Sequence, residues 1–364
     1  MAAALLQDEG FQVIGVTLRL WPCVASEPDR ACCSSDDLVH ARQAADRLGI
    51  PLRVLDVCES FRQEVLEPAW RDYDQGRTPN PCVRCNERVK FRFLIEEADR
   101  LGAQVVATGH HARIEGREGR LRLLRGRDRA KDQSYFLFRL LAGPLERLRF
   151  PIGERTKEEV RALARQLGLS AADRPESQDA CFVASRGGRT GFAEALRGYL
   201  GGRRRPGEVV DTQGRVLGRH SGLHGFTVGQ RRGIGVASRQ GRLYVVRLEP
   251  ASARVVVGPV EMLGTAGLVA RSVRWAHGPV SGSVLVQIRY RHQAAEAQVQ
   301  PLPDGRALVR FAEPQRAATP GQAAVFYRGE EVVGGGWIER ALADEERVGR
   351  EDRASADAQR GGEP

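Results

Sequence analysis

The sequence predicts an α/β + β fold, with a parallel sheet flanked by helices in the first part of the chain and β-barrel structure in the last. Up to about residue 111, strand patterns alternate with helix patterns, which is typical of a parallel sheet. From about residue 203, short β runs punctuated by glycine and proline follow one another, as in small barrels. At 364 residues, with 41% hydrophobic and 28% charged residues, the chain is long enough for two or three domains.

The N-terminal elements follow from hydrophobic periodicity and from glycine stops. The predicted elements are a helix over 2–9, a buried parallel strand over 11–20, a helix over 34–48, a strand over 52–57, a helix over 61–73 with a kink or break at Pro68, a helix over 91–101 and a strand over 104–108. Ligands of parallel sheets bind at the carboxyl ends of the strands. Those ends carry residues 18–21, 56–58 and 109–111.

The rest of the chain changes from mixed to all-β character. We expect a hairpin over 113–125, helices over 134–141, 157–167 and 192–200, and then β strands that include 268–275 and 283–291. The predicted domains are 1–187, a small central β-rich domain over 188–258, a C-terminal β-barrel over 265–343, and a disordered tail over 344–364 that lacks apolar periodicity.

The charge balance is compatible with a nucleic-acid partner. The chain has 56 basic and 46 acidic residues, a net charge of +10. Only three of the basic residues are lysine, and only two residues are asparagine. This usage resembles a GC-rich coding bias, which explains arginine in place of lysine but does not explain the surplus of positive charge. Both asparagines and two of the three lysines fall inside the motifs described below.

The lengths of the apolar runs, the residues at the start of the chain and the cysteine count together indicate a cytoplasmic protein. No uninterrupted apolar run is long enough for a membrane span, and Asp8 and Glu9 are unlike the start of a signal peptide. Seven cysteines, an odd number in a long chain, argue against a structural disulfide framework.

The strongest local motif is RTPNPCVRCNERVKF, residues 77–91, which we expect to lie between two helices. Its C-x-x-C, formed by Cys82 and Cys85, is compatible with a redox pair, half a zinc site or part of an iron–sulfur site. A structural zinc needs a second pair of ligands, for which only Cys32 and Cys33 lie upstream. Two solvent-side thiols without a role are the simplest alternative.

Four further segments carry polar or reactive residues. They are RPESQDACFV over 174–183 with Cys181, TGHH over 108–111 at a strand end, KDQSYF over 131–136 at the start of a helix, and GQRRGIG over 229–235. Each has an ordinary structural interpretation when taken alone: a buried strand cysteine, a strand end, a polar turn and an exposed basic hairpin, respectively.

Together these segments resemble the bacterial tRNA-specific 2-thiouridylase (MnmA/TrmU) family, whose members place sulfur on C2 of the wobble uridine. The matching motifs, in the family's order, are TPNPCVRCNERVKF, ATGHHARI, AKDQSYFLF, PESQDACFV, TVGQRRGIGV and TPGQAAVFYRGEEVVGGGWIE. The resemblance runs from residue 2 to about 342. It implies an adenine-nucleotide (pyrophosphatase-loop, HUP-like) domain and the activity of a tRNA-uridine 2-sulfurtransferase.

The resemblance also implies roles for individual residues. Cys85 matches the catalytic nucleophile, and Cys181 matches the cysteine that carries a persulfide. Leu18 and Gly109 match ATP-contacting positions. The positions that match tRNA contacts are His110, Lys131, Asp132, Gln133, Arg289, Tyr290 and Gln322. Of these, Arg289 and Tyr290 are expected on a barrel strand, where arginine can pair with phosphate and tyrosine can stack on an unpaired base.

The implied chemistry requires ATP, with Mg²⁺, and persulfide sulfur. A uracil C2 carbonyl is a poor electrophile, so ATP adenylates its oxygen and makes AMP the leaving group. A sulfur anion then attacks, and a second thiol releases the sulfur, which leaves a disulfide between Cys85 and Cys181. The expected partners are tRNAs with U34 (the Glu, Gln and Lys acceptors) and a sulfur-relay protein or cysteine desulfurase as sulfur donor. No membrane partner is expected.

The sequence departs from the family pattern in two places. The family's pyrophosphate loop, Ser-Gly-Gly-Val-Asp-Ser-Ser, does not precede the first helix, and we interpret Met1 as a start assigned too late, at a valine codon. If the chain does begin there, it is expected to leave an unfilled place beside its strands and to be an inactive tRNA-binding remnant. The second departure is Cys82, where some members carry aspartate, which makes a cluster held by Cys82, Cys85 and Cys181 an alternative. Argininosuccinate-type synthetases match poorly, because they lack the paired cysteines and the basic β domain.

Overall fold

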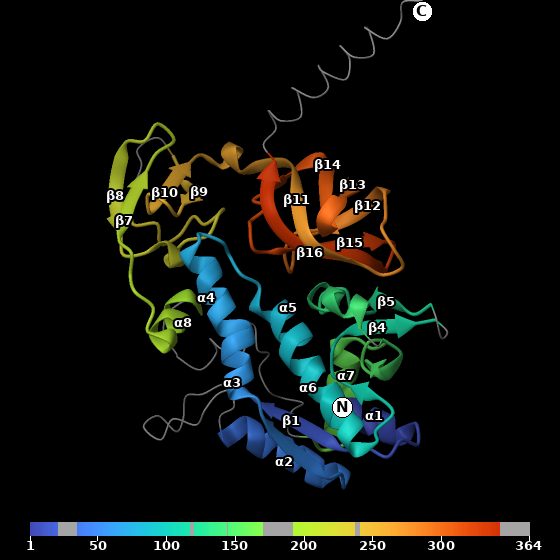
Figure 1. Ribbon diagram of the computed structural model, residues 1–364. Coiled ribbons are helices and arrows are strands. Elements are labelled where there is room, and N and C mark those ends of the chain that lie inside the picture. Colours follow the sequence, from blue (N-terminus) through green and yellow to red (C-terminus); the bar gives the residue numbers. More distant parts are fainter. Residues whose placement is uncertain (21–34, 117–119, 144, 170–191, 237–240, 343–364) are drawn as a thin grey trace, which may run out of the picture. The chain divides into compact units, whose positions relative to one another are not determined.

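The computed structural model describes residues 1–20, 35–116, 120–143, 145–169, 192–236 and 241–342 (Figure 1). The chain forms two compact units. The first, here the α/β unit, comprises residues 1–70, 80–202 and 330–332. The second, here the β unit, comprises residues 71–79, 203–329 and the chain from 333 onward.

Two parallel strand pairs are found in the α/β unit. Strand β1 (Gly15–Arg19) pairs with β2 (Leu52–Asp56), and β3 (Val106–Ala107) pairs with β6 (Leu148–Arg149). Within the described residues the two pairs are not hydrogen-bonded to each other. Helices α1 (Ala2–Asp8) and α2 (Ser35–Leu48) precede and follow β1.

Strand β1 is shorter and less buried than predicted. The prediction of a buried strand over 11–20 was wrong for residues 11–14, because the backbone there first has to end helix α1. Gly10 has φ +88°, and the N–H groups of Gly10 and Phe11 donate to the carbonyls of Gln7 and Leu6. Strand pairing then begins at Gly15, and all five residues of β1 are half-buried. Strand β3 likewise covers only two residues of the predicted 104–108.

Of the kink or break predicted at Pro68, the structure excludes the break. Helix α3 (Cys58–Phe61), a π turn over Arg62–Leu66 and α4 (Glu67–Asp74) follow one another without interruption (Figure 1). The Glu67 N–H donates to the carbonyl of Arg62, five residues back. This wider turn ends at Leu66, just ahead of Pro68, so the helix accommodates a residue that has no N–H to donate.

A second helix contains a π turn of the same length. Helix α5 (Pro81–Cys85), a π turn over Asn86–Lys90 and α6 (Phe91–Leu101) form one continuous stretch, which Gly102 ends in the left-handed region at φ +67°. The two π turns contact each other. The side chains of Val65, Val83 and Val89 are fully buried in this part of the α/β unit.

The remaining α/β elements agree with the sequence in position, though not always in type. They are the hairpin β4 (Ala112–Glu115) and β5 (Arg122–Arg125), 3-10 turns over Ser134–Phe136, Phe138–Ala142 and Leu145–Arg147, helix α7 (Lys157–Gln166) and helix α8 (Phe192–Leu200). The predicted helix over 134–141 is therefore two 3-10 turns, because its N–H groups donate three residues back, as from Leu137 to Ser134. Thr156 and Glu159 form a reciprocal capping box at the start of α7.

The β unit begins with a four-stranded sheet. Its strands are β7 (Gly207–Val210), β8 (Val216–His220), β9 (Tyr244–Glu249) and β10 (Arg254–Gly258), in the order β8-β7-β10-β9. A 3-10 turn covers Leu223–Gly225. Val209, Val245 and Val255, all fully buried, form the centre of its core.

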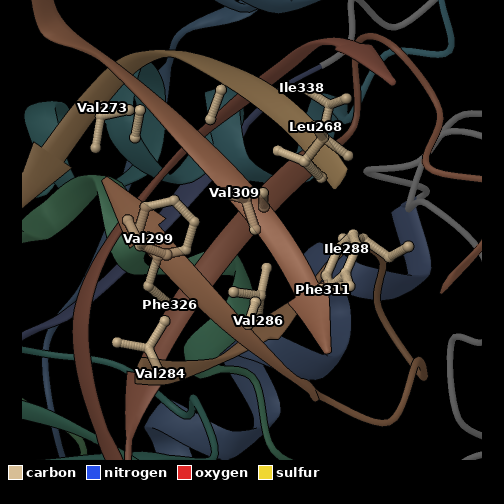
Figure 2. Close-up of a cluster of buried hydrophobic side chains, with 14 of the residues drawn as sticks. Leu268, Val273, Val284, Val286, Ile288, Val299, Val309, Phe311, Phe326 and Ile338 are labelled. Carbon is tan, nitrogen blue, oxygen red and sulfur yellow. The ribbon is translucent and has the colours of Figure 1, made fainter. Parts of the chain in front are cut away.

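A closed six-stranded barrel completes the β unit. Its strands are β11 (Gly264–Trp275), β12 (Gly282–Gln287), β13 (Ala295–Leu302), β14 (Arg306–Arg316), β15 (Ala323–Arg328) and β16 (Glu331–Leu342), with 3-10 turns over Val260–Leu263 and Pro303–Gly305. They pair in the order β11-β14-β13-β12-β15-β16, and β16 returns to pair with β11. Figure 2 shows Val286, Val309, Phe311 and Phe326 filling the interior. Closure removes the sheet edges that would otherwise pair with other chains.

Among the described residues, no helix combines the length and the apolar character that a membrane span requires.

Candidate functional site

The C-x-x-C motif lies on helix α5, not in a segment between helices as predicted. Asn80 caps the helix, with its Oδ1 accepting from the Val83 N–H at 3.4 Å, and Pro81 occupies the first turn. The three-residue spacing places Cys82 and Cys85 on the same helical face. Cys85 is buried, with 5% of its surface exposed, whereas Cys82 is half-buried. The interpretation of two solvent-side thiols is therefore wrong for Cys85.

The described cysteines are thiols. Cys58, Cys82 and Cys85 form no disulfide with one another. Cys181 lies outside the described residues, together with the rest of the 174–183 motif and with Cys23, Cys32 and Cys33. In the ranges that are described, no group of three or more Cys, His, Asp or Glu side chains is arranged to hold a metal ion. The Cys85–Cys181 pair and the three-cysteine cluster both stay predictions.

Two buried interactions connect the π turn after Cys85 to the 3-10 turns of the KDQSYF motif. The Asn86 amide donates from Nδ2 to the carbonyl of Phe136 at 3.2 Å. Next to it, Glu87 accepts from Arg139 at 2.9 Å, in an ion pair whose guanidinium is only 6% exposed. A buried, hydrogen-bonded pair fixes the geometry around it. It therefore holds the residues that directly follow Cys85.

Asp132 has an internal structural role in the KDQSYF motif. Its Oδ1 accepts from the N–H groups of Gly126 and Ser134, both at 3.0 Å. Its Oδ2 accepts from Arg125 and from the Ser134 hydroxyl, both at 2.9 Å. These four bonds fold the loop that carries Lys131 and Gln133.

Gln133 both accepts a hydrogen bond from the backbone of His111, in the TGHH motif, and donates one to it. Its side-chain oxygen accepts from the His111 N–H at 2.9 Å, and its own N–H donates to the His111 carbonyl at 2.8 Å. The structure thus joins two motifs that the sequence analysis could relate only by resemblance. Lys131 and Gln133 are both half-buried.

His110 is held as a neutral imidazole. Its Nδ1 lies 2.7 Å from the Thr108 hydroxyl, and its ring contacts the rings of Phe91 and Phe150 at centroid distances of 5.7 and 5.9 Å. Burial, together with the nearby positive charge of Lys90, lowers the pKa of His110 to about 3. A neutral ring in this place can donate or accept one hydrogen bond without adding charge.

This lowered pKa predicts acid sensitivity of the α/β unit. The unfolded chain binds a proton on His110 near pH 6.5, whereas the folded chain does so only near pH 3. The contribution of His110 to stability is therefore complete above pH 6.5 and falls as the pH is lowered from 6.5 toward 3. His110→Gln is expected to reduce the slope of the unfolding free energy against pH in this window. The reduction should reach at most the slope that corresponds to one bound proton. Urea denaturation at several pH values measures it, and an unchanged slope would contradict the assignment.

The two positions matched to ATP contacts lie at or near carboxyl ends of strands. Leu18 is the fourth residue of β1, and Gly109 follows β3. Gly109 is exposed, and an added Cβ would meet only the Ile152 side chain, at an ordinary 3.8 Å. Local packing therefore does not require glycine at position 109. A close approach by a ligand is one physical reason for glycine at such a position.

Polar groups also gather at the ends of β1 and β2. Arg19 and Asp56 are opposite each other in the register and form an ion pair. Asp56 also accepts from the Cys58 N–H at 3.1 Å, and the Cys58 thiol donates to the Arg19 carbonyl. The hydrogen bond from Arg19, with those from Cys58, lowers the pKa of Asp56 to about 2. The Asp56 carboxylate at this edge of the sheet is therefore charged at neutral pH.

Gln322, in the β unit, holds the chain segment that leads to the C-x-x-C helix. Its amide donates from Nε2 to the carbonyls of Thr78 and Pro79, at 3.1 and 3.0 Å. The Thr78 N–H donates in turn to the Pro320 carbonyl at 2.9 Å. Gly321 allows this close approach: it has φ +93°, and a Cβ there would lie 2.7 Å from the Thr78 oxygen.

The prediction that Arg289 and Tyr290 lie on a barrel strand was wrong. Strand β12 ends at Gln287, and both residues lie in the connection to β13. The chain turns there because Arg291 adopts a left-handed φ of +61° and the His292 N–H donates to the Arg289 carbonyl. The Arg291 guanidinium lies 5.9 Å from the centre of the Tyr290 ring. The pair is thus on a loop, where side chains are free of the in–out alternation of a strand.

Several structurally important residues had no assigned role in the sequence analysis. Asn80, Asn86 and the Glu87–Arg139 pair all fix the surroundings of Cys85. One signal could have found the first two: the chain has only two asparagines, and both lie in the motif over 77–91. Nothing in the sequence pairs Glu87 with Arg139, which are 52 positions apart.

Comparison with known families assigns a class to this architecture. Three family models match in chain order: the tRNA methyl transferase HUP domain over 1–185, the tRNA methyl transferase PRC-barrel domain over 194–259, and the aminomethyltransferase β-barrel domain over 265–338. The protein thus has the three-part architecture of HUP-domain, tRNA-directed proteins. The predicted α/β + β fold class is confirmed.

Individual relatives narrow the class to one family. The chain is 46% identical over 352 residues to a protein of Geobacter metallireducens, with 94% of each chain covered. It is 47% identical to a relative from Acidithiobacillus ferrooxidans, with 93% of this chain and 94% of the relative covered. It is also 47% identical to a relative from Rhodospirillum centenum, with 94% of this chain and 89% of the relative covered. All three are named tRNA-specific 2-thiouridylase MnmA. The chain belongs to the tRNA-specific 2-thiouridylase family.

Proposed function

We propose that the protein catalyses ATP-dependent 2-thiolation of the wobble uridine, U34, of tRNA. The observation that carries this proposal is the identity of about 46% to the named thiouridylases, which extends over almost the whole chain. The capped, buried Cys85 on α5 supports it, because a thiolation site needs a positioned sulfur nucleophile. We also propose the domain limits 1–187, 188–258 and 265–343.

In the proposed reaction, Cys181 carries the sulfur and Cys85 releases it. ATP supplies activation of the C2 oxygen by adenylation. The terminal sulfur of the Cys181 persulfide attacks C2, and AMP leaves with the oxygen. The Cys85 thiolate then attacks Sγ of Cys181, breaks the S–S bond, and leaves the electron pair on the sulfur now bound to C2. A Cys85–Cys181 disulfide results, which a dithiol reductant must reduce before the next turnover.

Residues of both the strand ends and the cysteine motifs would serve the nucleotide and the sulfur donor. Leu18 and Gly109, at or near carboxyl ends of strands, would contact ATP, which binds with Mg²⁺. The open space at Gly109 supports this role. A cysteine desulfurase or sulfur-relay protein would load Cys181. The tRNA substrates would be the Glu, Gln and Lys acceptors.

We propose two kinds of tRNA-binding residue. Lys131, Arg289 and Tyr290 would contact the RNA through charge and stacking. His110 would offer a neutral ring. The side chains of Asp132, Gln133 and Gln322 are engaged within the protein, so they would support the tRNA-binding surface by holding its loops.

A direct test is thiolation in vitro. Purified protein is incubated with a U34-containing tRNA transcript, ATP, Mg²⁺ and a persulfide donor, and the tRNA is resolved on a mercury-containing gel that retards thiolated RNA. Retarded tRNA that requires ATP and contains 2-thiouridine at position 34 is the expected result. Thiolation at another position would contradict the proposal. So would the absence of thiolation when the protein is loaded with persulfide and is expressed from genomic DNA that includes the sequence upstream of the Met1 codon.

Removal of the loop residues Arg289 and Tyr290 is expected to weaken tRNA binding. The double variant Arg289→Ala/Tyr290→Ala loses one phosphate contact and one stacking contact, and stacking alone contributes about 1–3 kcal/mol per base. Affinity should fall at least tenfold, and the dependence of log Kd on log salt should flatten by about 0.7–0.9. Arg306→Ala, which removes an exposed arginine paired with Asp304, is the matched control. Equal affinities of the double variant and the control at two salt concentrations would remove this loop from the RNA interface.

A further inference from the structure

The GQRRGIG motif forms a hollow that the proposed reaction does not use. This hollow, here the GQRR pocket, has a volume of about 240 Å³ and is lined by Arg231, Ile234, Val236, Gly241, Arg242 and Leu243. One water needs only about 10–15 Å³ of such space. The pocket can therefore admit a larger polar group.

The pocket is built on a fixed turn. The Gly229 N–H donates to the Val245 carbonyl at 2.8 Å, and the Val245 N–H donates to the Gln230 carbonyl at 2.9 Å, which joins the turn to strand β9. Gly229 has φ +88°, and a Cβ there would lie 3.0 Å from the Cβ of Ala317, just after β14. The turn thus rests against both the four-stranded sheet and the barrel of the β unit.

Tyr244 orders the arginines beside the pocket. The Arg316 guanidinium lies 4.9 Å from the centre of the Tyr244 ring, a cation–π contact. Hydrogen bonds from Arg316 and, to a smaller extent, from Arg231 lower the pKa of the Tyr244 hydroxyl. One tyrosine therefore brings together an arginine of the turn and an arginine at the end of β14.

The charge here is not neutralised by neighbouring acids. Arg231, Arg232, Arg242 and Arg316 are exposed, and none of them forms an ion pair with a carboxylate of the described part of the chain. Elsewhere on the same sheet, Arg215 pairs with Asp211 and Arg247 pairs with Glu249, at 2.6 and 2.7 Å.

Apolar residues of the pocket anchor it to the four-stranded sheet. Ile234 is 5% exposed, and it packs with Val236 and Leu243 into the core of the four-stranded sheet.

We propose that the GQRR pocket binds a backbone phosphate of the tRNA substrate, with Arg231 and Arg242 as its ligands. Guanidinium groups match phosphate oxygens in a planar fork. The pocket lies in the β unit, whereas the positions proposed for ATP lie in the α/β unit. The inference rests on the proposed function, because it takes tRNA to be the substrate.

The test compares two double variants of equal charge. Arg231→Ala/Arg242→Ala removes the pocket's ligands, and Arg215→Ala/Arg247→Ala removes two exposed arginines of the same sheet that are already paired with acids. Affinity for a U34-containing tRNA is measured at several salt concentrations. The pocket variant is expected to bind about tenfold more weakly than the control, with a salt slope smaller by about 0.7–0.9 for the phosphate contact that is lost. The KM for ATP is expected to stay unchanged.

The other outcomes separate the possible failures. If the wild type thiolates tRNA but both double variants bind it equally well, the pocket inference is wrong and the proposed function stands. If the KM for ATP rises in the pocket variant while tRNA affinity is unchanged, the pocket holds a nucleotide phosphate, which also overturns the inference. If the wild type neither binds nor thiolates tRNA, the proposed function fails and this inference fails with it.

Discussion

Cys85→Ser is expected to abolish thiolation of tRNA. Serine keeps the size of the side chain, but at neutral pH its hydroxyl supplies neither a thiolate nor a sulfur that can form a disulfide. Because Cys85 ends a helix whose cap and following π turn are both fixed, the substitution should leave the fold unchanged. Thiolation is measured on a mercury gel, with the protein expressed from its own genomic region.

Cys181→Ser is expected to be equally inactive, and ATP-dependent adenylation should survive in both variants. Substantial activity in either Cys85→Ser or Cys181→Ser would contradict the two-cysteine route.

Cys82→Ser distinguishes this route from the cluster alternative. In the persulfide route Cys82 is a neighbour of Cys85 on the same helical face, so its loss should leave substantial activity. In the cluster route it is an iron ligand, so its loss should be as severe as that of Cys85 or Cys181 and should abolish the visible absorbance of the cluster. Anaerobically purified wild type that contains stoichiometric iron and sulfide, together with three inactive variants, would decide for the cluster.

Glu87→Gln is expected to destabilise the α/β unit by about 3 kcal/mol. The substitution leaves the Arg139 guanidinium, which is 6% exposed, without the carboxylate that it contacts at 2.9 Å. Removal of one partner of a buried ion pair typically costs about 3–5 kcal/mol. The partial exposure of Glu87, 18%, favours the lower end of this range. Urea denaturation followed by far-UV circular dichroism measures the change.

The double variant Glu87→Met/Arg139→Met is the control for this effect. It removes both charges, and replacement of a buried pair by apolar residues is often close to neutral. The double variant should therefore be more stable than Glu87→Gln. If the two variants are equally destabilised, the loss comes from packing and not from the removal of one charge of the Glu87–Arg139 pair.

The elements with clear periodicity could be predicted from sequence. Helix α7 agrees with the pattern because a local capping box at Thr156 specifies its start, and helix α6 agrees because Gly102 in the left-handed region specifies its end. The π turn that precedes Pro68 was not predicted, because such a turn has no sequence signature. The turn at Arg289 was missed because a non-glycine residue, Arg291, adopts a positive φ there.

The candidate site could be predicted only in part. The resemblance assigns Cys85 from its motif, but it does not show that Cys85 is buried or that Asn86 and Glu87 are fixed to the chain 50 residues or more further on. It matches Gln322 to a tRNA contact, which stays a prediction, and it does not show that the Gln322 amide donates to the carbonyls of Thr78 and Pro79. Contacts over such sequence distances arise from tertiary packing, which neither periodicity nor a motif encodes.

The most direct test of the central claim is mass spectrometry of tRNA nucleosides from cells that lack the gene. We expect that 2-thiouridine derivatives at position 34 of the Glu, Gln and Lys tRNAs disappear, and that the wild-type gene, but not the Cys85→Ser variant, restores them. Normal levels of 2-thiouridine in the deletion strain would contradict the claim that this protein thiolates U34.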